Sequence, residues 1–403
     1  MKVLVSAWHE IRRNAETSQT EQTKQAALQF GENLPRKLRQ LQDRLRKGYK
    51  FSPAFGATPP KGKGKAGKRP IVVAPLEDRI VQRAILDVLQ DATEVGDVQA
   101  VLKTKTSIGG IRGRGVDHAI ALFAERVDAG DKYAAGSDIS GFFQKIRPGD
   151  VVTFLTKAGV ERGFVELVEH ALTVELVNEG QLSSEDRALF PTGADGVAQG
   201  CPLSALAGNI VLHEFDERMN ERGITCIRYI DDFIIVGKGR SSVEAAMRAA
   251  KTLLATLGMD IYDPATSPNK AFAGPIDKGH EFLGYQLVPG RYPPSKASVD
   301  KFMAGIGSLI REGKRSIKKA VTDRKLTSRD RCYVQTLAAI DNTIGGWRGS
   351  FKSSVNPDDF VQLDLMIDRR LHDFRQFYLQ HLANQPSFRR RRASGVRLVS
   401  EPR

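Results

Sequence analysis

The segment 227–236, Ile-Arg-Tyr-Ile-Asp-Asp-Phe-Ile-Ile-Val, decides the fold of this chain. Two adjacent carboxylates, Asp231 and Asp232, lie between apolar runs rich in Ile and Val, a pattern that predicts a β-hairpin with the acids at its tight turn. Like charges held side by side raise one another's pKa and resist burial unless a cation lies against them. Oxygen ligands suit a hard divalent cation, so we expect Mg²⁺ at this turn.

A third carboxylate is needed if two metal ions are to act together. Enzymes that transfer phosphoryl groups hold two ions roughly 3.5–4 Å apart, one at the attacking oxygen and one at the leaving group. Asp138 is the candidate, because it ends a short run of small residues, 134–138, and is followed by a turn and two aromatic residues. An isolated Asp-Asp pair is more often a solvated turn, so the metal-site prediction depends on the neighbouring motifs.

Three segments, in this order, resemble the palm motifs of reverse transcriptases. Residues 138–143, Asp-Ile-Ser-Gly-Phe-Phe, are similar to the first motif, residues 199–204, Gln-Gly-Cys-Pro-Leu-Ser, to the second, and residues 229–232, Tyr-Ile-Asp-Asp, to the third. The resemblance implies an α+β right-hand polymerase fold, with fingers, a palm built on an antiparallel sheet with helices on one face, and a helical thumb. It also implies two Mg²⁺ ions and a deoxynucleoside triphosphate (dNTP) substrate. By the same resemblance Asp138, Asp231 and Asp232 are catalytic and bind metal, and Ile139 adds its backbone carbonyl.

Residues 68–86 resemble the fingers of group II intron and retron-like reverse transcriptases, in which an Arg-Pro-Ile strand leads into an Asp-Arg-Ile-Val-Gln helix. By this resemblance Arg69 contacts the triphosphate of the incoming nucleotide, and a guanidinium group suits phosphate oxygens because it binds them bidentately. Arg79 is a candidate for a phosphate or template contact. The alternative for Arg79 is an ion pair on the helix surface with Glu77 or Asp78.

Four further residues receive roles from the resemblance. Phe143 stands at the position of the sugar gate, where a bulky ring excludes a 2′-hydroxyl, whereas Phe142 is expected in the core. Gln199 and Gly200 are expected to begin the helix under the templating base pair, with glycine where the backbone approaches the nucleotide. Lys270 stands where the family often has a general acid that protonates pyrophosphate, and a surface lysine is the alternative.

Composition predicts the same kind of partner. The net charge is +14 and the sequence pI is about 9.7, which suits a polyanion such as nucleic acid. The three cysteines are widely spaced, which argues against a disulfide framework or a zinc site and favours a reducing cytoplasm. With no run of 18 apolar residues and no signal peptide, we expect a cytoplasmic protein without a membrane partner.

The pattern along the chain predicts five parts. Residues 1–50 are a helical extension, either a packing cap or an RNA contact; residues 51–135 are the fingers, with a flexible cationic loop at 52–68; and residues 136–290 are the palm. Residues 291–385 are a basic helical thumb, and 386–403 are a basic tail, either mobile and RNA-binding or merely solubilising. Within these parts, residues 107–120 resemble a segment whose glycines let the backbone approach phosphates, with His118 structural, and residues 281–285 resemble the primer grip.

The resemblance extends to a subgroup by elimination. No nuclease motif follows the thumb, and segments associated with retron enzymes are not apparent, so the chain most resembles the compact unknown-group, defence-associated reverse transcriptases of bacteria. The predicted function is therefore an RNA-directed DNA polymerase that copies a companion non-coding RNA into cDNA in anti-phage defence. The partners are that RNA and the cDNA duplex, with a homo-oligomer as a further option. Retron or group II intron-like enzymes, an RNA-dependent RNA polymerase and a catalytically quiet RNA-binding scaffold are the alternatives.

Overall fold

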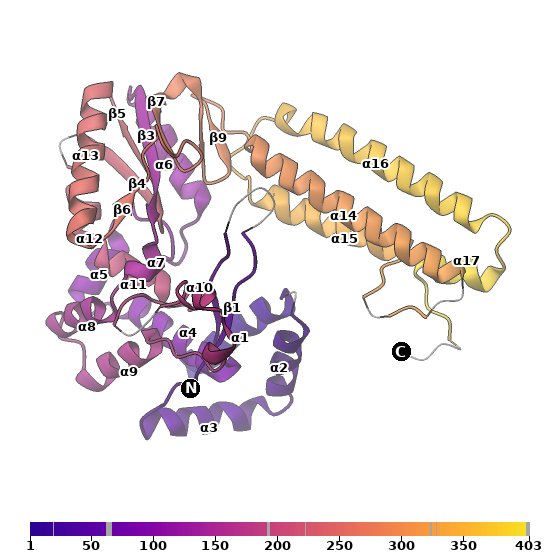
Figure 1. Cartoon of the computed structure of the whole chain (residues 1–403), viewed down its shortest axis with the longest axis horizontal. Helices are drawn as coiled ribbons and strands as arrows, with labels where there is room; N and C mark the ends of the chain where they lie inside the picture. Colours follow the sequence, from indigo (N-terminus) through magenta and orange to yellow (C-terminus); the bar gives the residue numbers. More distant parts are fainter. Residues whose placement is uncertain are drawn as a thin grey trace. The chain divides into compact units, whose positions relative to one another are not determined.

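The structure is a computed structural model that describes residues 1–18, 20–61, 67–191, 194–221, 223–322, 325–327 and 329–399. The chain divides into two compact units, Met1–Gly274 and Pro275–Arg403 (Figure 1).

An antiparallel sheet lies at the centre of the first unit. Its strand order is β4 (Thr225–Tyr229), β5 (Asp232–Gly237), β3 (Tyr133–Ser140) and β6 (Asp260–Ile261), and β7 (Ala271–Pro275) also pairs with β3. The β-branched and aromatic run of β5 is fully buried, as expected for a central strand. The register places Asp138 of β3 opposite Asp232 of β5. The α+β fold class predicted from the sequence is confirmed.

Helices cover this sheet. Helix α13 (Arg240–Thr256) packs against β3, β5 and β6, and α6 (Val116–Asp128) packs against β4 and β5 (Figure 1). Phe233 and Ile235 belong to the same buried cluster as residues of α13. Because side chains alternate between the two faces of a strand, Asp232 points to the face opposite α13.

The first unit contains further helices before and between the strands of the sheet. Helix α1 packs along α4, with Trp8 and Ile11 in the shared core, and residues 1–50 contain helices α1, α2 and α3. The bounds of these further helices are α1 Lys2–Glu16, α2 Glu21–Gly31, α3 Leu34–Arg46, α4 Leu76–Asp91, α5 Gly96–Lys103, α7 Phe142–Lys145, α8 Pro148–Lys157, α9 Arg162–Leu172, α10 Ser184–Arg187, α11 Ser204–Val211 and α12 His213–Arg218, with a short 3₁₀ helix at Glu179–Gln181.

Part of the segment 52–68, which was expected to be a flexible cationic loop, forms a β-strand. Residues Phe55–Ala57 form strand β1, which pairs antiparallel with β2 (Ile71–Val73). Asn178 fixes β1 from a distant part of the chain, because its side chain hydrogen-bonds both the N–H and the carbonyl of Gly56. The loop prediction was therefore wrong for this strand, and Lys63 and Lys65 lie outside the described residues.

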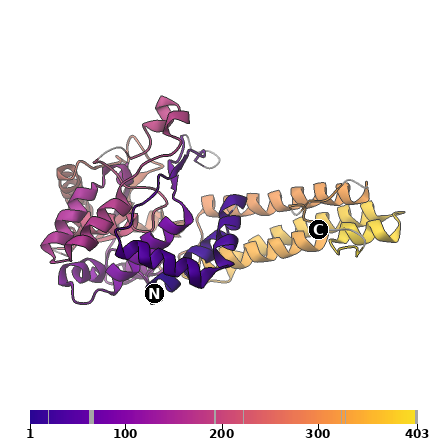
Figure 2. The same cartoon turned by 90° about the horizontal axis from the view of Figure 1, so that it is seen from below.

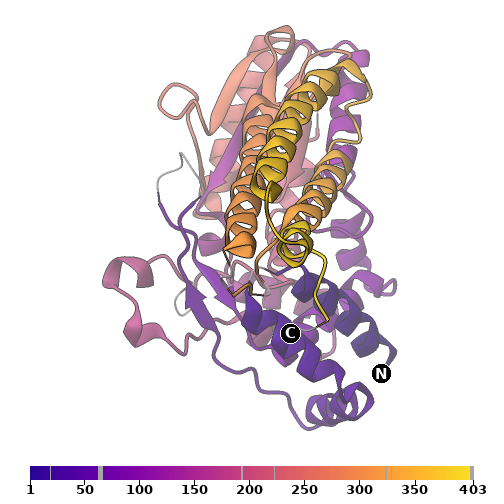
Figure 3. The same ribbon diagram turned by 90° about the vertical axis from the view of Figure 1, so that its right-hand side faces the viewer.

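The second unit begins with a 3₁₀ helix (Ile276–Lys278) and the hairpin β8 (His280–Phe282) and β9 (Tyr285–Leu287), and continues as helices α14 (Lys296–Val321), α15 (Tyr333–Gly349), α16 (Asp358–Leu382) and α17 (Ser387–Ser394). The three long helices lie along one another, as Figures 2 and 3 show. Their core includes the stacked rings of Phe302 and Trp347, with centroids 4.2 Å apart.

The predicted basic tail is partly a packed helix. Helix α17 packs against α14, and Arg392 and Ala393 are buried in that contact. The carbonyl of Gly395, just after the helix, accepts a hydrogen bond from the side chain of Gln335. The expectation of a mobile tail was therefore wrong for residues 387–395. The buried side chain of Ala393 and the hydrogen bond to the Gly395 carbonyl hold this basic segment against the helices.

Two expectations about composition can be compared with the structure. Among the described residues, no helix combines the length and the apolar character needed to cross a bilayer. The three cysteines Cys201, Cys226 and Cys332 are all free thiols.

Candidate active site

The acidic turn joins β4 to β5 through two residues, Ile230 and Asp231, as the sequence predicts. Ile230 has φ of 62°, whereas Asp231 does not have a positive φ, the combination found in a type II′ hairpin turn. Glycine is preferred at the first of these positions, and a β-branched residue there is strained. Such strain persists only where the surrounding structure holds the turn in place.

The structure brings Asp138 next to this turn. Asp138 lies directly opposite Asp232 in the ladder, and paired residues of antiparallel strands point to the same face of a sheet. The N–H of Ile139 donates to the carbonyl of Asp231 over 2.8 Å. The three predicted carboxylates therefore belong to one small region at the end of the sheet.

Lys270 is exposed and lies next to Asp138. Its ammonium group forms an ion pair with Oδ2 of Asp138, and its carbonyl accepts the N–H of Asp138 over 3.2 Å. The ammonium nitrogen lies 5.2 Å from the centroid of the Tyr262 ring. A cation thus already lies against one of the predicted metal ligands.

Opposing electrostatic effects act on the carboxyl group of Asp231. Burial raises the pKa of its carboxyl group, and a backbone hydrogen bond and the positive charges of Arg228 and Arg69 act in the opposite direction. Within the described residues, no three His, Cys, Asp or Glu side chains gather closely enough to form a metal cluster. The fit to Mg²⁺ therefore rests on the donor chemistry, which is all carboxylate and carbonyl oxygen, and on the register of Asp138 with Asp232.

Arg69 and Arg79 differ in their surroundings. Arg69 is exposed and close enough to Asp231 for its charge to act there. Arg79 is half-buried, and burial lowers its pKa. Neither ion pair considered for Arg79 forms, because Glu77 pairs with Arg44 and Asp78 is bound by Tyr49 and Ser52. That alternative was wrong, and the Arg79 guanidinium forms no hydrogen bond or ion pair with a described residue.

Gln199 and Gly200 lie before the helix that they were expected to begin, so that expectation was wrong. Helix α11 starts at Ser204, after Pro202, and the carbonyl of Gln199 instead accepts the N–H of Val72 over 2.9 Å. Gly200 has φ of 113°, and a Cβ there would lie 2.9 Å from the Val72 carbonyl oxygen. This loop is therefore fixed to the strand that follows Arg69.

Phe142 and Phe143 differ in burial, and Phe142 lies in the core as predicted. Phe142 is buried, and a Cβ at Gly208 would lie only 2.4 Å from its ring. Phe143 is half-buried, lies edge-on to Phe142 at 5.2 Å, and accepts the N–H of Val197 through its backbone. Part of the Phe143 ring therefore remains accessible.

Sequence reasoning missed Arg228, which lies one residue before the Tyr-Ile-Asp-Asp turn. Its side chain is 0% exposed and donates hydrogen bonds to Asp216, to the Ile230 carbonyl, to Ser107 and to Asn209. The one signal in the sequence is a charged residue inside an apolar strand. Nothing in the sequence identifies its partners.

Three other polar residues of the segment 107–120 have structural contacts. Arg114 donates to the carbonyls of Leu102 and Thr104 at the end of α5 and to that of Ser107 in the loop that follows, and Arg112 pairs with Asp87 and Asp91. His118 accepts the N–H of Gly115 at the start of α6, in agreement with its predicted structural role.

Comparison with known proteins decides the family. Residues 59–287, more than half of the chain, match the family described as reverse transcriptase (RNA-dependent DNA polymerase). The chain belongs to the reverse transcriptase family. This reverse transcriptase is 27% identical over 292 residues to "Protein YkfC" of Escherichia coli strain K12, a match that covers 62% of this chain and 71% of that protein.

A solved structure of apo telomerase from Candida Tropicalis, truncated from its C-terminal domain, is similar with a TM-score of 0.39 and 10% sequence identity. That match covers 61% of this chain, which spans 55% of the telomerase chain. The predicted enzyme class, an RNA-directed DNA polymerase and hence a nucleotidyltransferase, is confirmed by membership of the family, and the family implies an RNA template.

Proposed function

We propose that this reverse transcriptase extends a primer 3′-hydroxyl along an RNA template with dNTPs, and that Asp138, Asp231 and Asp232 hold two Mg²⁺ ions for this reaction. One observation carries the proposal: the register that sets Asp138 opposite Asp232, with Asp231 in the adjoining turn. Reverse transcriptase domains generally use divalent metal ions and dNTPs, which agrees with this set of oxygen donors.

Each residue of the site has a separate task in the proposal. The three carboxylates and the carbonyl of Ile139 would hold the ions, and the register of Asp138 with Asp232 supports this set of ligands. When bound, Mg²⁺ activates the attacking hydroxyl and neutralises charge at the leaving group. Much of the rate enhancement then comes from holding the primer and the nucleotide in line.

The cationic residues would act on the phosphates. The exposed Arg69, close to Asp231, is suited to bind the triphosphate bidentately. Arg79, which lacks a described partner and is half-buried, would gain one on a phosphate or on the template. Lys270 would exchange the Asp138 carboxylate for the departing pyrophosphate and donate a proton to it, which its position at Asp138 supports.

Selectivity would come from the loops that border the acids. The partly accessible ring of Phe143 would clash with a 2′-hydroxyl, so deoxynucleotides should be preferred. Gln199 and Gly200 would lie under the templating base pair, with the left-handed conformation of Gly200 allowing close approach of the backbone. The alternative of an RNA-dependent RNA polymerase predicts the reverse preference.

The biological setting belongs to the same proposal. We assign this reverse transcriptase a companion non-coding RNA as template and a part in bacterial anti-phage defence. The sequence resemblance to compact defence-associated enzymes supports this assignment. A phage plaque assay with the native locus tests it, with Asp231→Asn as the inactive comparison, and equal plaque counts for both would count against defence.

The experiment that tests the template is purification from the native locus followed by sequencing of the bound RNA and DNA, repeated with Asp231→Asn. A single abundant RNA with complementary DNA that disappears in the variant is the expected result. Heterogeneous RNA without DNA would instead favour the RNA-binding scaffold. Addition of ribonucleotides and deoxynucleotides in parallel separates the two polymerase classes.

A further inference from the structure

Arg228 lies behind the catalytic turn. It pairs with Phe233 across the β4–β5 ladder, and paired residues share a face, so its side chain points to the face of the sheet opposite Asp232. We infer that Arg228, together with Asp216, is a positioning residue that holds the backbone of the turn so that Asp231 and Asp232 are arranged for divalent cations before they bind. This inference rests on the proposed role of those two carboxylates.

The side chain of Arg228 joins distant parts of the chain at one buried point. Its Nε donates to Asp216 Oδ1 of α12 over 2.7 Å, and its Nη2 donates to Asn209 Oδ1 of α11 over 3.0 Å and to Ser107 Oγ over 2.7 Å. Its remaining terminal nitrogen, Nη1, donates to the carbonyl of Ile230 over 2.9 Å. That last bond reaches the strained residue of the catalytic turn.

The backbone of Arg228 also binds the segment 106–112, which packs against the turn. Its N–H donates to the carbonyl of Thr106 and its carbonyl accepts the N–H of Ile108, each over 2.8 Å. These bonds bring the next residue, Gly109, against Ile230, where a Cβ on Gly109 would lie 2.4 Å from Ile230 Cγ1. Asn209 binds the carbonyl of Gly109 as well as Arg228.

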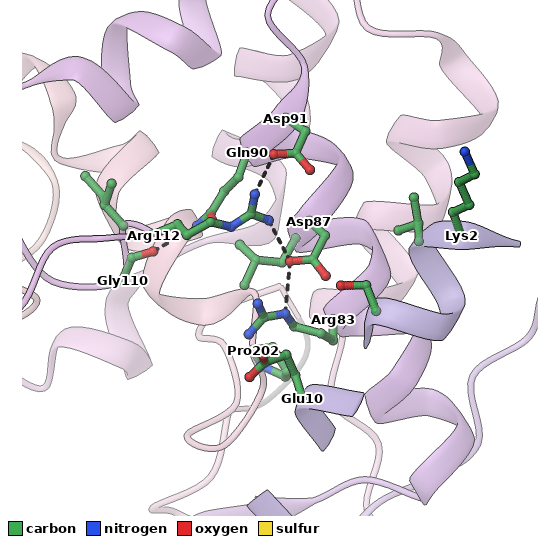
Figure 4. Close-up of a pocket in the computed structure, with 13 residues that line it drawn as sticks. Lys2, Glu10, Arg83, Asp87, Gln90, Asp91, Gly110, Arg112 and Pro202 are labelled. Atoms are coloured by element: carbon green, nitrogen blue, oxygen red, sulfur yellow. Dashed lines mark hydrogen bonds and ion pairs between the residues drawn. The ribbon is translucent and has the colours of Figure 1, made fainter. Parts of the chain in front are cut away.

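The C-terminal end of the segment 106–112 is bound to helix α4. Gln90 donates to the carbonyl of Gly110, and Arg112 pairs with Asp91 and with Asp87, whose Oδ1 also accepts from Arg83 (Figure 4). These residues line one wall of a cavity of about 730 Å³ between α1, α4 and the loop 110–112. The segment 106–112 is therefore fixed at both ends, with the catalytic turn packed against its middle.

The chemistry of the buried pair favours a positioning role over a stabilising one. Well-packed apolar residues often stabilise a core as well as a buried ion pair does, so the pair is not needed for burial alone. Arginine supplies donors in a fixed planar arrangement that can reach a carboxylate, an amide and a backbone carbonyl together. Lysine keeps the charge but cannot reproduce that arrangement.

The test compares Arg228→Lys with a matched control, Arg126→Lys. Arg126 pairs over 2.9 Å with Asp131, whose side chain is 0% exposed, in the same unit but without a contact to the turn. Mn²⁺ binding to the protein without nucleic acid is measured by electron paramagnetic resonance, and amide hydrogen exchange is followed over residues 229–232. Melting temperature and duplex RNA–DNA binding report on the fold.

For Arg228→Lys we expect Mn²⁺ affinity to fall by about tenfold or more, as for residues that orient metal ligands, with faster exchange in the turn. The Mg²⁺ concentration for half-maximal primer extension should rise by a similar factor, while duplex binding stays unchanged. Arg126→Lys should behave as the unmodified protein in all metal measurements. If Arg228→Lys does not fold, Ser107→Ala removes one hydrogen bond of the set and should weaken Mn²⁺ binding by about threefold.

Unchanged Mn²⁺ affinity and exchange in a folded Arg228→Lys would overturn the inference. An equal loss in Arg126→Lys would overturn it too, because the effect would then be general destabilisation. If the unmodified protein makes no DNA from any template, the proposed function fails. A difference between the two variants in Mn²⁺ binding would still support the role of Arg228.

Discussion

Substituting Gly109 by alanine should damage catalysis without touching a catalytic residue. A Cβ at this position would lie 2.4 Å from Cγ1 of Ile230 and 2.6 Å from its backbone nitrogen. Non-bonded atoms pack at about 3.5 Å or more, so the turn must retreat by roughly 1 Å. A rotamer change of Ile230 relieves only the first contact, since the second is with backbone. Misplacement of about 1 Å can lower a rate by about 100-fold, or ~2.7 kcal/mol in the barrier.

The assay is single-turnover primer extension on an RNA template, with melting temperature measured in parallel. Gly96→Ala is the control, because a Cβ at Gly96, at the start of α5, would have no neighbour within 4 Å. We expect Gly109→Ala to lose about 100-fold in rate while still binding the duplex. Synthesis by Gly109→Ala at the rate of Gly96→Ala, with equal melting temperature, would show that a Cβ at position 109 does not displace the turn.

Three further predictions concern single residues of the site. Phe143→Ala should raise the use of ribonucleotides relative to deoxynucleotides by about tenfold or more, measured by competition of the two substrates; an unchanged ratio would remove Phe143 as the gate. Arg69→Ala should raise the KM for dNTP by about tenfold to 100-fold, as expected for the loss of charge-assisted hydrogen bonds, and a normal KM would exclude a triphosphate contact. Burial raises the pKa of Asp231, so the folded state favours the protonated carboxyl group. The folding stability of the protein therefore decreases as pH rises through that raised pKa and the group becomes charged. Asp231→Asn should therefore increase the melting temperature of the metal-free protein near pH 7 and lose that gain near pH 4, where unfolded Asp titrates; thermal melts with a chelator check this.

Local pattern was sufficient for the elements that carry the acids. The hairpin around Asp231 and Asp232 follows from two apolar β-branched runs that flank a polar pair, which is information contained in ten residues. The amphipathic helices α3 and α4 follow in the same way from apolar spacing. The order of the three motifs then indicated that Asp138 lies near the hairpin, and the register of β3 with β5 agrees.

Contacts between distant residues were not predictable. The partners of Arg228 lie 12, 19 and 121 residues away, at Asp216, Asn209 and Ser107. Strand β1 depends on Asn178, 122 residues later. Such pairs form only once the fold brings them together, so local pattern gives no sign of them. The loop at Gln199 was misassigned for the same reason, because its backbone partner Val72 lies on a separate hairpin.

In the proposed mechanism, Asp138, Asp231 and Asp232 act together in DNA synthesis on RNA. The most direct measurement is incorporation of dNTPs on an RNA template by the purified chain and by Asp231→Asn and Asp232→Asn, with RNA binding measured on the same samples. We predict that both variants lose synthesis while binding RNA within about twofold of the unmodified protein, because amides of the same size keep the local packing but remove the anionic ligands. DNA synthesis by either variant at the rate of the unmodified chain would contradict this account.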